Sequence, residues 1–279
     1  MTPASNFVII RNMMTKKEID KGRAFDWGKV SEDYAKFRDI YPNLFYQKII
    51  ESGLCLKGQH VLDLGTGTGV LPRNLYKYGA SFVGADISEN QIKQAKRLSS
   101  EAGMNIEYIV SSAEDVKLPD ESFDVIIAAQ CFEYFDKKVA LPNIHRMLKD
   151  DGHFCVLFMA WLPDENELAC GSEELILKYN PNWTGYGMKR YKLETPKWSE
   201  ELFEIEKAET FDLNVNFNRE NWHGRIKACR GIGASSLTNS EIASFEEEHL
   251  EFLNKQPETF DILHFVSVLN LRKKRVINL

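Results

Sequence analysis

The sequence predicts an α/β protein built on a seven-stranded sheet, and two features of the chain predict it. Between about residues 53 and 163, five short apolar runs alternate with polar stretches of helical periodicity, which is the pattern of βαβ units with a parallel sheet. Two more strand-like segments follow after long insertions, at 203–217 and 261–271. Together these segments account for seven strands.

The elements follow from the hydrophobic pattern in chain order. The first five strands are expected at the apolar runs 60–65, 81–86, 106–110, 123–129 and 153–158. Apolar residues at helical spacing predict helices between them over 70–78, 88–102 and 138–148. Ser88 is suited to cap the second of these helices and Gly103 to end it. Outside this core, one or two helices broken at Tyr41-Pro42 are expected over 30–52, a less regular segment over 164–196, and helices over 219–230 and 239–255.

Composition narrows the classes of function. The 35 basic and 41 acidic side chains give a formal net charge of −6, which argues against broad nucleic-acid binding. The five cysteines are scattered without a Cys-x-x-Cys pair, so neither a disulfide framework nor a metal site is expected. The most apolar run, 154–162, is too short to span a bilayer, and no secretory signal pattern opens the chain. We therefore expect a cytoplasmic protein with no membrane or nucleic-acid partner. The sequence does not indicate the oligomeric state.

The most informative segment is a glycine loop between a predicted strand and a predicted helix. It contains Gly65, Thr66, Gly67 and Gly69, and Val70 stands where the dinucleotide fingerprint has its third glycine. Glycines allow positive φ and close approach of a ligand to the backbone.

Two acidic residues flank this loop. Asp63 comes two residues before Gly65, where it would repel a pyrophosphate and attract an ammonium group. Asp86 ends the next strand, 17 residues after Gly69, where it can accept both hydroxyls of a ribose. S-adenosylmethionine combines these features and is the expected cofactor. The alternative is that Asp63 caps the loop and Asp86 forms a turn.

Five motifs in order resemble those of class I S-adenosylmethionine-dependent methyltransferases of the type 11 group, which includes ubiquinone/menaquinone-biosynthesis and trans-aconitate-type enzymes. They lie at 61–69, 84–88, 112–115, 118–125 and 148–152, and the resemblance covers about residues 27–160. It implies a Rossmann-like, mostly parallel seven-stranded sheet with the last strand antiparallel and helices on both faces. It also implies an N-terminal helical cap over the donor site at 1–52, a methyltransferase domain at 53–279, and a variable acceptor-side elaboration at 164–258.

The resemblance also assigns donor-site roles. The glycine loop would wrap the methionine part of the donor, Asp86 and Ile87 would hold ribose and adenine, and Gln130 would face the donor. The family usually has Gly-Asp-Ala where this chain has Ser111-Ser112-Ala113. The carboxylate for the adenine amino group is therefore replaced by the Ser112 hydroxyl or supplied by Glu114 or Asp115.

The N-terminal helix carries a further candidate pair for the donor. Tyr34 and Arg38 lie four residues apart and therefore on one helix face. By the resemblance, they would meet the methionine carboxylate. A solvated helix surface is the alternative for Arg38.

The acceptor site is expected from three segments. Tyr134 follows the fourth strand and would lie near the methyl group, although core packing explains it equally well. Trp161 could line or close the pocket. The segment 222–230 places Trp222, His223, Arg225 and Arg230 together, which suits an anionic acceptor because guanidinium binds carboxylate in bidentate fashion. His223 could act as a base. A basic helix face with a buried Trp is the alternative.

These observations favour a methyltransferase that acts by in-line displacement on a small, anionic or carboxylate-bearing molecule. An RNA or protein methyltransferase with the same donor is the alternative. An NAD(P)-dependent oxidoreductase fits less well because of Val70 and Asp63. A non-catalytic donor-binding protein is the last hypothesis, since a fold does not determine a function.

Overall fold

A computed structural model describes residues 14–193 and 197–275. It comprises two compact units, which we describe one at a time. Among the described residues, the first unit contains 14–40, 160–190 and 212–265, and the second contains 41–159, 191–211 and 266–275. The division predicted at residue 52 is sequential, whereas these units each combine segments from distant parts of the chain. The predicted division stays a prediction.

The sheet has seven strands in the order β3-β2-β1-β4-β5-β7-β6. The pairs β1–β2, β1–β4, β2–β3 and β4–β5 are parallel, and in the first of them Asp63 lies opposite Gly84. This order confirms the predicted Rossmann-like fold class, a mostly parallel seven-stranded sheet with helices around it. The strands are β1 His60–Leu64, β2 Ser81–Asp86, β3 Glu107–Val110, β4 Phe123–Ala129, β5 Leu148–Trp161, β6 Phe203–Asn218 and β7 Thr259–Lys273.

The second unit has its core around the first five strands. Leu64, Ile126, Ile144 and Phe154 are all buried there. Ser88 caps α5 by accepting a hydrogen bond from the backbone N–H of Gln91, as predicted. The helices of this unit are α3 Asn43–Glu51, α4 Val70–Leu75, α5 Glu89–Glu101 and α6 Lys137–Met147.

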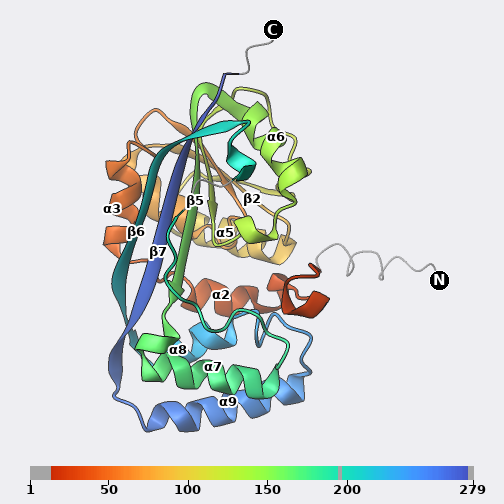
Figure 1. The fold of residues 1–279 in the computed structure, drawn as a ribbon, viewed down its shortest axis with the longest axis vertical. Helices are drawn as coiled ribbons and strands as arrows, with labels where there is room; N and C mark the ends of the chain where they lie inside the picture. The colour runs from red at the N-terminus through yellow and green to blue at the C-terminus, as the bar shows by residue number, and fades with distance from the viewer. Residues whose placement is uncertain (1–13, 194–196, 276–279) are drawn as a thin grey trace, which may run out of the picture. The chain divides into compact units, whose positions relative to one another are not determined.

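The first unit is mainly helical (Figure 1). Helix α2 packs on α8, α8 packs on α9, and α9 packs on α7. The approach of α2 to α8 is close, since a Cβ on Gly224 would lie 2.3 Å from the Phe37 ring. The helices are α2 Ser31–Phe37, α7 Glu167–Tyr179, α8 Arg219–Lys227 and α9 Asn239–Asn254.

Two expectations about these elements are wrong. The segment 164–196 is not irregular throughout, because residues 167–179 form α7 with Asn166 as its N-cap. Its buried residues Leu168, Ala169, Ser172, Glu173 and Ile176 follow helical spacing, but three of these five are small or polar. Strand β5 also begins at Leu148 instead of residue 153, with an irregularity in its register opposite residues 123–125.

None of the helices in the described ranges is both long enough and apolar enough to cross a membrane.

Candidate functional site

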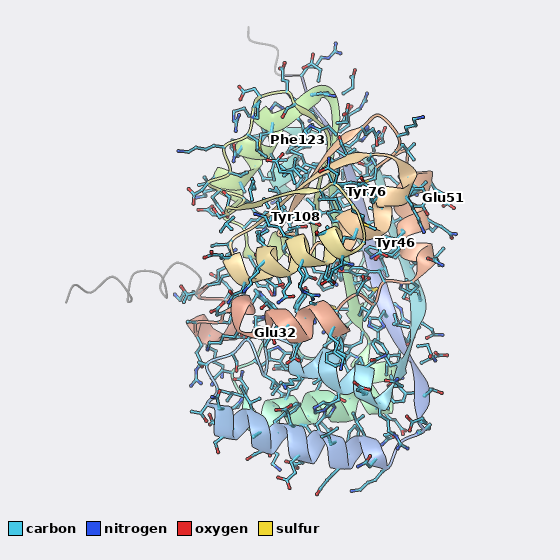
Figure 2. The ribbon with its side chains drawn as sticks, turned by 180° about the vertical axis from the view of Figure 1, so that it is seen from behind. Glu32, Tyr46, Glu51, Tyr76, Tyr108 and Phe123 are labelled. Carbon is cyan, nitrogen blue, oxygen red and sulfur yellow. The ribbon has the colours of Figure 1, made fainter. Side chains whose placement is uncertain are left out.

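The glycine loop, residues 65–69, joins β1 to α4 in the second unit. Gly65, Gly67 and Gly69 have φ values of +65°, +56° and +73°, in the left-handed region that favours glycine. A Cβ on Gly69 would lie 2.3 Å from the hydroxyl oxygen of Tyr108, a strand residue labelled in Figure 2. A Cβ on Gly65 would lie 2.6 Å from Cys131 Sγ. The backbone conformation and the packing beneath the loop both require glycine at these two positions.

Asp86 holds the loop from the end of β2. Its Oδ2 accepts a hydrogen bond from the Gly67 N–H at 2.8 Å, and its Oδ1 accepts one from the Ser88 N–H at 2.8 Å. Burial raises the pKa of this carboxyl, and the two backbone hydrogen bonds oppose that effect. Each carboxylate oxygen keeps further acceptor capacity. The carboxylate can therefore bind hydroxyl groups without releasing the loop.

Asp63 lies under the loop on β1 and is 3% exposed. The Thr66 hydroxyl donates to its Oδ2 at 2.6 Å. The pKa of Asp63 is raised to about 7, mainly by burial and also by the charge of Asp86, while the Thr66 hydrogen bond opposes the rise. A cation placed beside Asp63 would favour its ionised form. Two buried carboxyl groups at one loop suit a cationic ligand and disfavour a pyrophosphate.

The segment after β3 departs from the family pattern in a specific way. The Ser112 hydroxyl donates to Asp115 Oδ2 at 3.0 Å and accepts from the Asp115 N–H at 3.1 Å. Glu114 Oε1 accepts from the Asp136 N–H at 2.7 Å, at the start of α6. Ala113 is buried. The Glu114 carboxylate is thus already bound at another helix, and the Ser112–Asp115 pair is the polar group nearest in sequence to the predicted adenine position.

Gln130 has a different position from the one expected. It is a non-glycine residue with φ +64°, and its amide donates to the Met159 carbonyl oxygen and accepts from the Met159 N–H. Both polar atoms of the amide are therefore bonded to β5, and the predicted contact with the donor gains no support. Tyr134 lies in the short 3-10 turn Phe132–Tyr134 after β4.

Sequence reasoning missed two residues around the glycine loop. Cys131 donates its thiol hydrogen to the Leu64 carbonyl oxygen, with an Sγ–O distance of 3.0 Å, and Tyr108 fills the space beside Gly69 and Gly84. The signal for Tyr108 was available, because it is the inward-facing aromatic of a predicted strand. The position of Cys131 gives no comparable signal, since a lone cysteine is usually a small core residue.

Tyr34 and Arg38 lie together in the first unit, whereas the glycine loop belongs to the second. The Arg38 guanidinium carbon is 4.7 Å from the Tyr34 ring centroid and 6.0 Å from that of Trp27. Tyr34 and Arg38 therefore contact one another, as their spacing of four residues allows. Their role at the methionine carboxylate stays a prediction.

Trp222 is a core residue of the first unit, and its predicted contact with a substrate is wrong. Its side chain is fully buried, its Nε1–H donates to Ser172 Oγ at 2.9 Å, and its ring packs edge-on against Trp161 and Phe217. A side chain enclosed in this way has no surface left for a ligand.

His223 belongs to a buried chain of polar groups. Its Nδ1 is 3.0 Å from His249 Nδ1, and His249 Nε2 is 3.0 Å from Ser172 Oγ. On the other side, His223 Nε2 lies 3.7 Å from Glu246 Oε1. Burial lowers the pKa of both histidines, that of His249 to about 3. Both nitrogens of His223 face partners within the unit, so its predicted role as a base gains no support.

Arg230 is bound by Asp20, which corrects its predicted role in substrate binding. The two side chains form a buried ion pair and are 9% and 6% exposed. The Asp20 carboxylate also accepts from the Thr184 N–H at 2.9 Å, and Asp20 has φ +48°. Arg230 therefore ties the turn at residue 20 to the loop that contains Thr184.

Arg225 and Trp161, which were each predicted at the acceptor, lie in contact with one another. The Arg225 guanidinium carbon lies 4.9 Å from the Trp161 ring centroid, and the guanidinium makes no ion pair with any described residue. The Trp161 Nε1–H donates to Glu173 Oε1 at 2.6 Å. Of the predicted acceptor residues, these two are in contact in the first unit, and their role at an acceptor stays a prediction.

Within residues 14–193 and 197–275, no group of three or more His, Cys, Asp or Glu side chains is arranged to hold a metal ion.

Comparison with known proteins agrees with this geometry. The profile of a family described as "Methyltransferase domain" matches residues 62–156, which contain the glycine loop and Asp86. The ubiquinone biosynthesis O-methyltransferase of Bartonella bacilliformis is 31% identical over 191 residues, which cover 61% of this chain and 76% of that protein. The chain belongs to the type 11 family of class I S-adenosylmethionine-dependent methyltransferases. S-adenosylmethionine is the cofactor of this family.

Other type 11 relatives match over a shorter part. The ubiquinone biosynthesis O-methyltransferase of Coxiella burnetii is 30% identical over 142 residues, 49% of this chain and 58% of that protein. The chain thus spans little more than half the length of this relative. A solved structure described as a candidate type II methyltransferase from Anaeromyxobacter dehalogenans has a TM-score of 0.56 at 19% identity, covering 85% of this chain and 97% of that one. This last likeness supports the fold.

Proposed function

We propose that this protein transfers the methyl group of S-adenosylmethionine to a small-molecule acceptor that carries an anionic group, of which a carboxylate is the first candidate. One observation carries the proposal. A left-handed glycine loop is flanked by two buried carboxyl groups, those of Asp63 and Asp86, inside a type 11 methyltransferase domain.

The residues present fit the donor. Without a side chain at 65, 67 or 69, the loop backbone is open to close approach by the methionine part. The Asp63 carboxyl suits the donor's ammonium group, because a neighbouring positive charge compensates the burial that raises its pKa. We assign Asp86 to the ribose hydroxyls and Ile87, which follows it, to the adenine. When bound, S-adenosylmethionine supplies a methyl group on a sulfonium, which is already activated for displacement.

The chain's own contribution to the reaction is then placement. A lone pair on the acceptor forms the new bond to the methyl carbon while the carbon–sulfur bond breaks and its electrons go to sulfur. Such a step requires the acceptor atom about 3 Å from the methyl carbon and water excluded from the site. A base is needed only if the acceptor arrives protonated.

Two lines support a small, anionic acceptor. The relatives in Bartonella bacilliformis and Coxiella burnetii carry the name of O-methyltransferases of ubiquinone biosynthesis, which supports a small molecule. Helix α8 supplies Arg225, whose guanidinium has no anionic partner among the described residues.

We keep a cytoplasmic location and the absence of a nucleic-acid partner as part of the proposal.

The test is a set of parallel calorimetric titrations with S-adenosylmethionine, S-adenosylhomocysteine and NAD. The proposal expects micromolar binding of the first two ligands and none of NAD. An acceptor screen that begins with small carboxylates should then produce S-adenosylhomocysteine. Binding of NAD alone would overturn the proposal. Donor binding with turnover only on RNA or protein would replace the acceptor class, and donor binding without any turnover would favour a non-catalytic role.

A further inference from the structure

Helix α8 of the first unit contains a buried cation that lacks a counter-charge. Arg225 is 5% exposed, and its Nε and Nη1 atoms are buried with no hydrogen-bond partner. No carboxylate among the described residues lies within ion-pair distance of it. The guanidinium carbon lies 4.9 Å from the centroid of the Trp161 ring, over which it stacks.

The other deeply buried cations in the described parts of the chain are satisfied. Arg230 pairs with the carboxylate of Asp20, and Lys273 donates to the Leu148 carbonyl oxygen at 2.7 Å. On α8 itself, Lys227 lies 2.8 Å from Glu246 Oε1 and 3.4 Å from Asp33 Oδ2. Residues 14–193 and 197–275 therefore supply partners for the neighbouring cations but no counter-charge for Arg225.

Physical chemistry makes an unpaired buried guanidinium costly. Removing a charge from water without pairing it is unfavourable, and arginine cannot escape the cost by losing its proton, as a buried lysine or histidine can. A cation–π contact with Trp161 compensates only part of that cost. The described residues therefore leave room for an anionic partner of this guanidinium.

The surroundings favour a carboxylate on an apolar or aromatic body. A guanidinium presents a planar fork that matches a carboxylate through two parallel hydrogen bonds. A single guanidinium suits a monoanion better than a doubly charged phosphate. The Trp161 ring forms an apolar wall where the guanidinium stacks, and this ring packs edge-on against the enclosed Trp222 ring, with centroids 5.5 Å apart at 77°.

Glu173 fixes this wall and is not itself the counter-charge. Its Oε1 accepts from Trp161 Nε1–H at 2.6 Å, and its Oε2 accepts from the Gly187 N–H at 2.8 Å. Each oxygen of Glu173 thus has a partner within the unit, and no ion pair joins Glu173 to Arg225. Glu173 is a positioning residue, because it holds the indole on which Arg225 stacks.

We propose that Arg225, stacked on Trp161, anchors a carboxylate ligand in the first unit. That this carboxylate belongs to the methyl acceptor rests on the proposed function. The binding site itself does not depend on that function.

The experiment titrates the full-length protein with benzoate and with its neutral counterpart benzamide, following tryptophan fluorescence and heat. Benzoate should bind and benzamide should bind at least about tenfold more weakly, because the charged hydrogen bonds are lost. Arg225→Met should lower benzoate affinity at least about tenfold, and Arg225→Lys should be intermediate, because it keeps the charge but not the fork. The matched control, Arg97→Met, removes an exposed arginine on α5 and should leave benzoate binding unchanged.

Several outcomes would overturn the proposal. These are equal binding of benzoate and benzamide, equal benzoate binding by wild type and Arg225→Met, or binding of inorganic phosphate in preference to benzoate. If Arg225→Met does not fold, the wild-type protein with ¹⁵N-labelled arginine still decides, since benzoate should shift one Nε–H resonance that is missing in Arg225→Lys. A parallel titration with S-adenosylmethionine separates the two proposals. If the wild type binds benzoate through Arg225 but does not bind S-adenosylmethionine, the methyltransferase function alone is rejected. If it binds S-adenosylmethionine but its benzoate binding does not depend on Arg225, this inference alone is rejected.

Discussion

The Thr66 hydroxyl donates to Asp63 Oδ2 at 2.6 Å, and within the described part of the chain no other side chain makes a hydrogen bond to that buried carboxyl group. A single hydroxyl does not compensate its burial, and the pKa of Asp63 is raised to about 7. The carboxyl group is consequently poised to ionise when a cation arrives.

Donor affinity should therefore depend on pH. If the donor's ammonium group binds the ionised form of Asp63, affinity should rise with pH up to about 7 and then level off, because below that pH the proton must first be removed. Calorimetry with S-adenosylmethionine between pH 5.5 and 8.5 measures this. Asp63→Asn should bind more weakly at pH 8 and lose the slope.

The same shift makes a prediction for stability. Because the folded-state pKa is raised, the unfolded chain loses its proton first, and the stability contributed by protonated Asp63 is lost as pH rises from about 4 to about 7. Asp63→Asn should consequently unfold at higher urea concentration than wild type at pH 8. If Asp63→Asn had the same urea midpoint as the wild type at pH 8, the pKa of Asp63 would not be raised in the folded protein.

Asp86→Ala should impair both the loop and donor binding. The substitution removes the acceptors of the Gly67 and Ser88 N–H groups as well as the proposed ribose contact. We expect donor binding to weaken by about 1–3 kcal/mol, as for the loss of hydrogen bonds to a charged acceptor. Calorimetry checks this, with Asp151→Ala as a control because that side chain is 81% exposed. Unchanged donor affinity in Asp86→Ala would reject the ribose assignment.

Arg230→Met should unfold more readily than wild type. It leaves the Asp20 carboxylate buried without its cation, and breaking a buried ion pair in this way costs about 3–5 kcal/mol. Urea unfolding measures the loss. The double variant Arg230→Met, Asp20→Asn should recover part of it, and a single variant as stable as wild type would show that the pair contributes little.

His249 should contribute to unfolding in acid. Its folded-state pKa is lowered to about 3 by burial and by the neighbouring His223, so its stability contribution is present above about pH 6.5 and is lost as pH falls toward 3. In a series of urea titrations, His249→Gln should show a shallower fall of stability over this interval. If the unfolding free energy of His249→Gln fell with pH as steeply as that of the wild type, groups other than His249 would cause the acid sensitivity.

Local pattern was sufficient for the framework of the second unit. Strands β1 and β2 are neighbouring apolar runs of a parallel sheet. The glycine loop follows β1 and Asp86 ends β2, so chain spacing alone predicts their proximity. Helix α7 was missed because its buried face includes Ser172 and Glu173, which stay buried only through hydrogen bonds to Trp222, His249, Trp161 and Gly187. Such partners are distant in sequence.

The same limit applies to the predicted acceptor residues. Arg225 and Arg230 lie five residues apart and look equivalent in the sequence. Arg230 has a carboxylate partner, Asp20, which is 210 positions away, and Arg225 has none among the residues that the structure describes. Only tertiary structure decides which arginine is free to bind a ligand, because ion pairing between distant segments leaves no periodic signal in the sequence.

Tyr108 occupies the volume that a side chain at Gly69 or Gly84 would need, and Cys131 does the same for Gly65. Selection for a stable interior would therefore preserve these glycines even in a descendant that had stopped binding the donor. A relative that keeps the glycines but has lost both Asp63 and Asp86 would be expected to share the architecture without the chemistry. In surveys of the family, the two acids are consequently better markers of retained donor binding than the glycines.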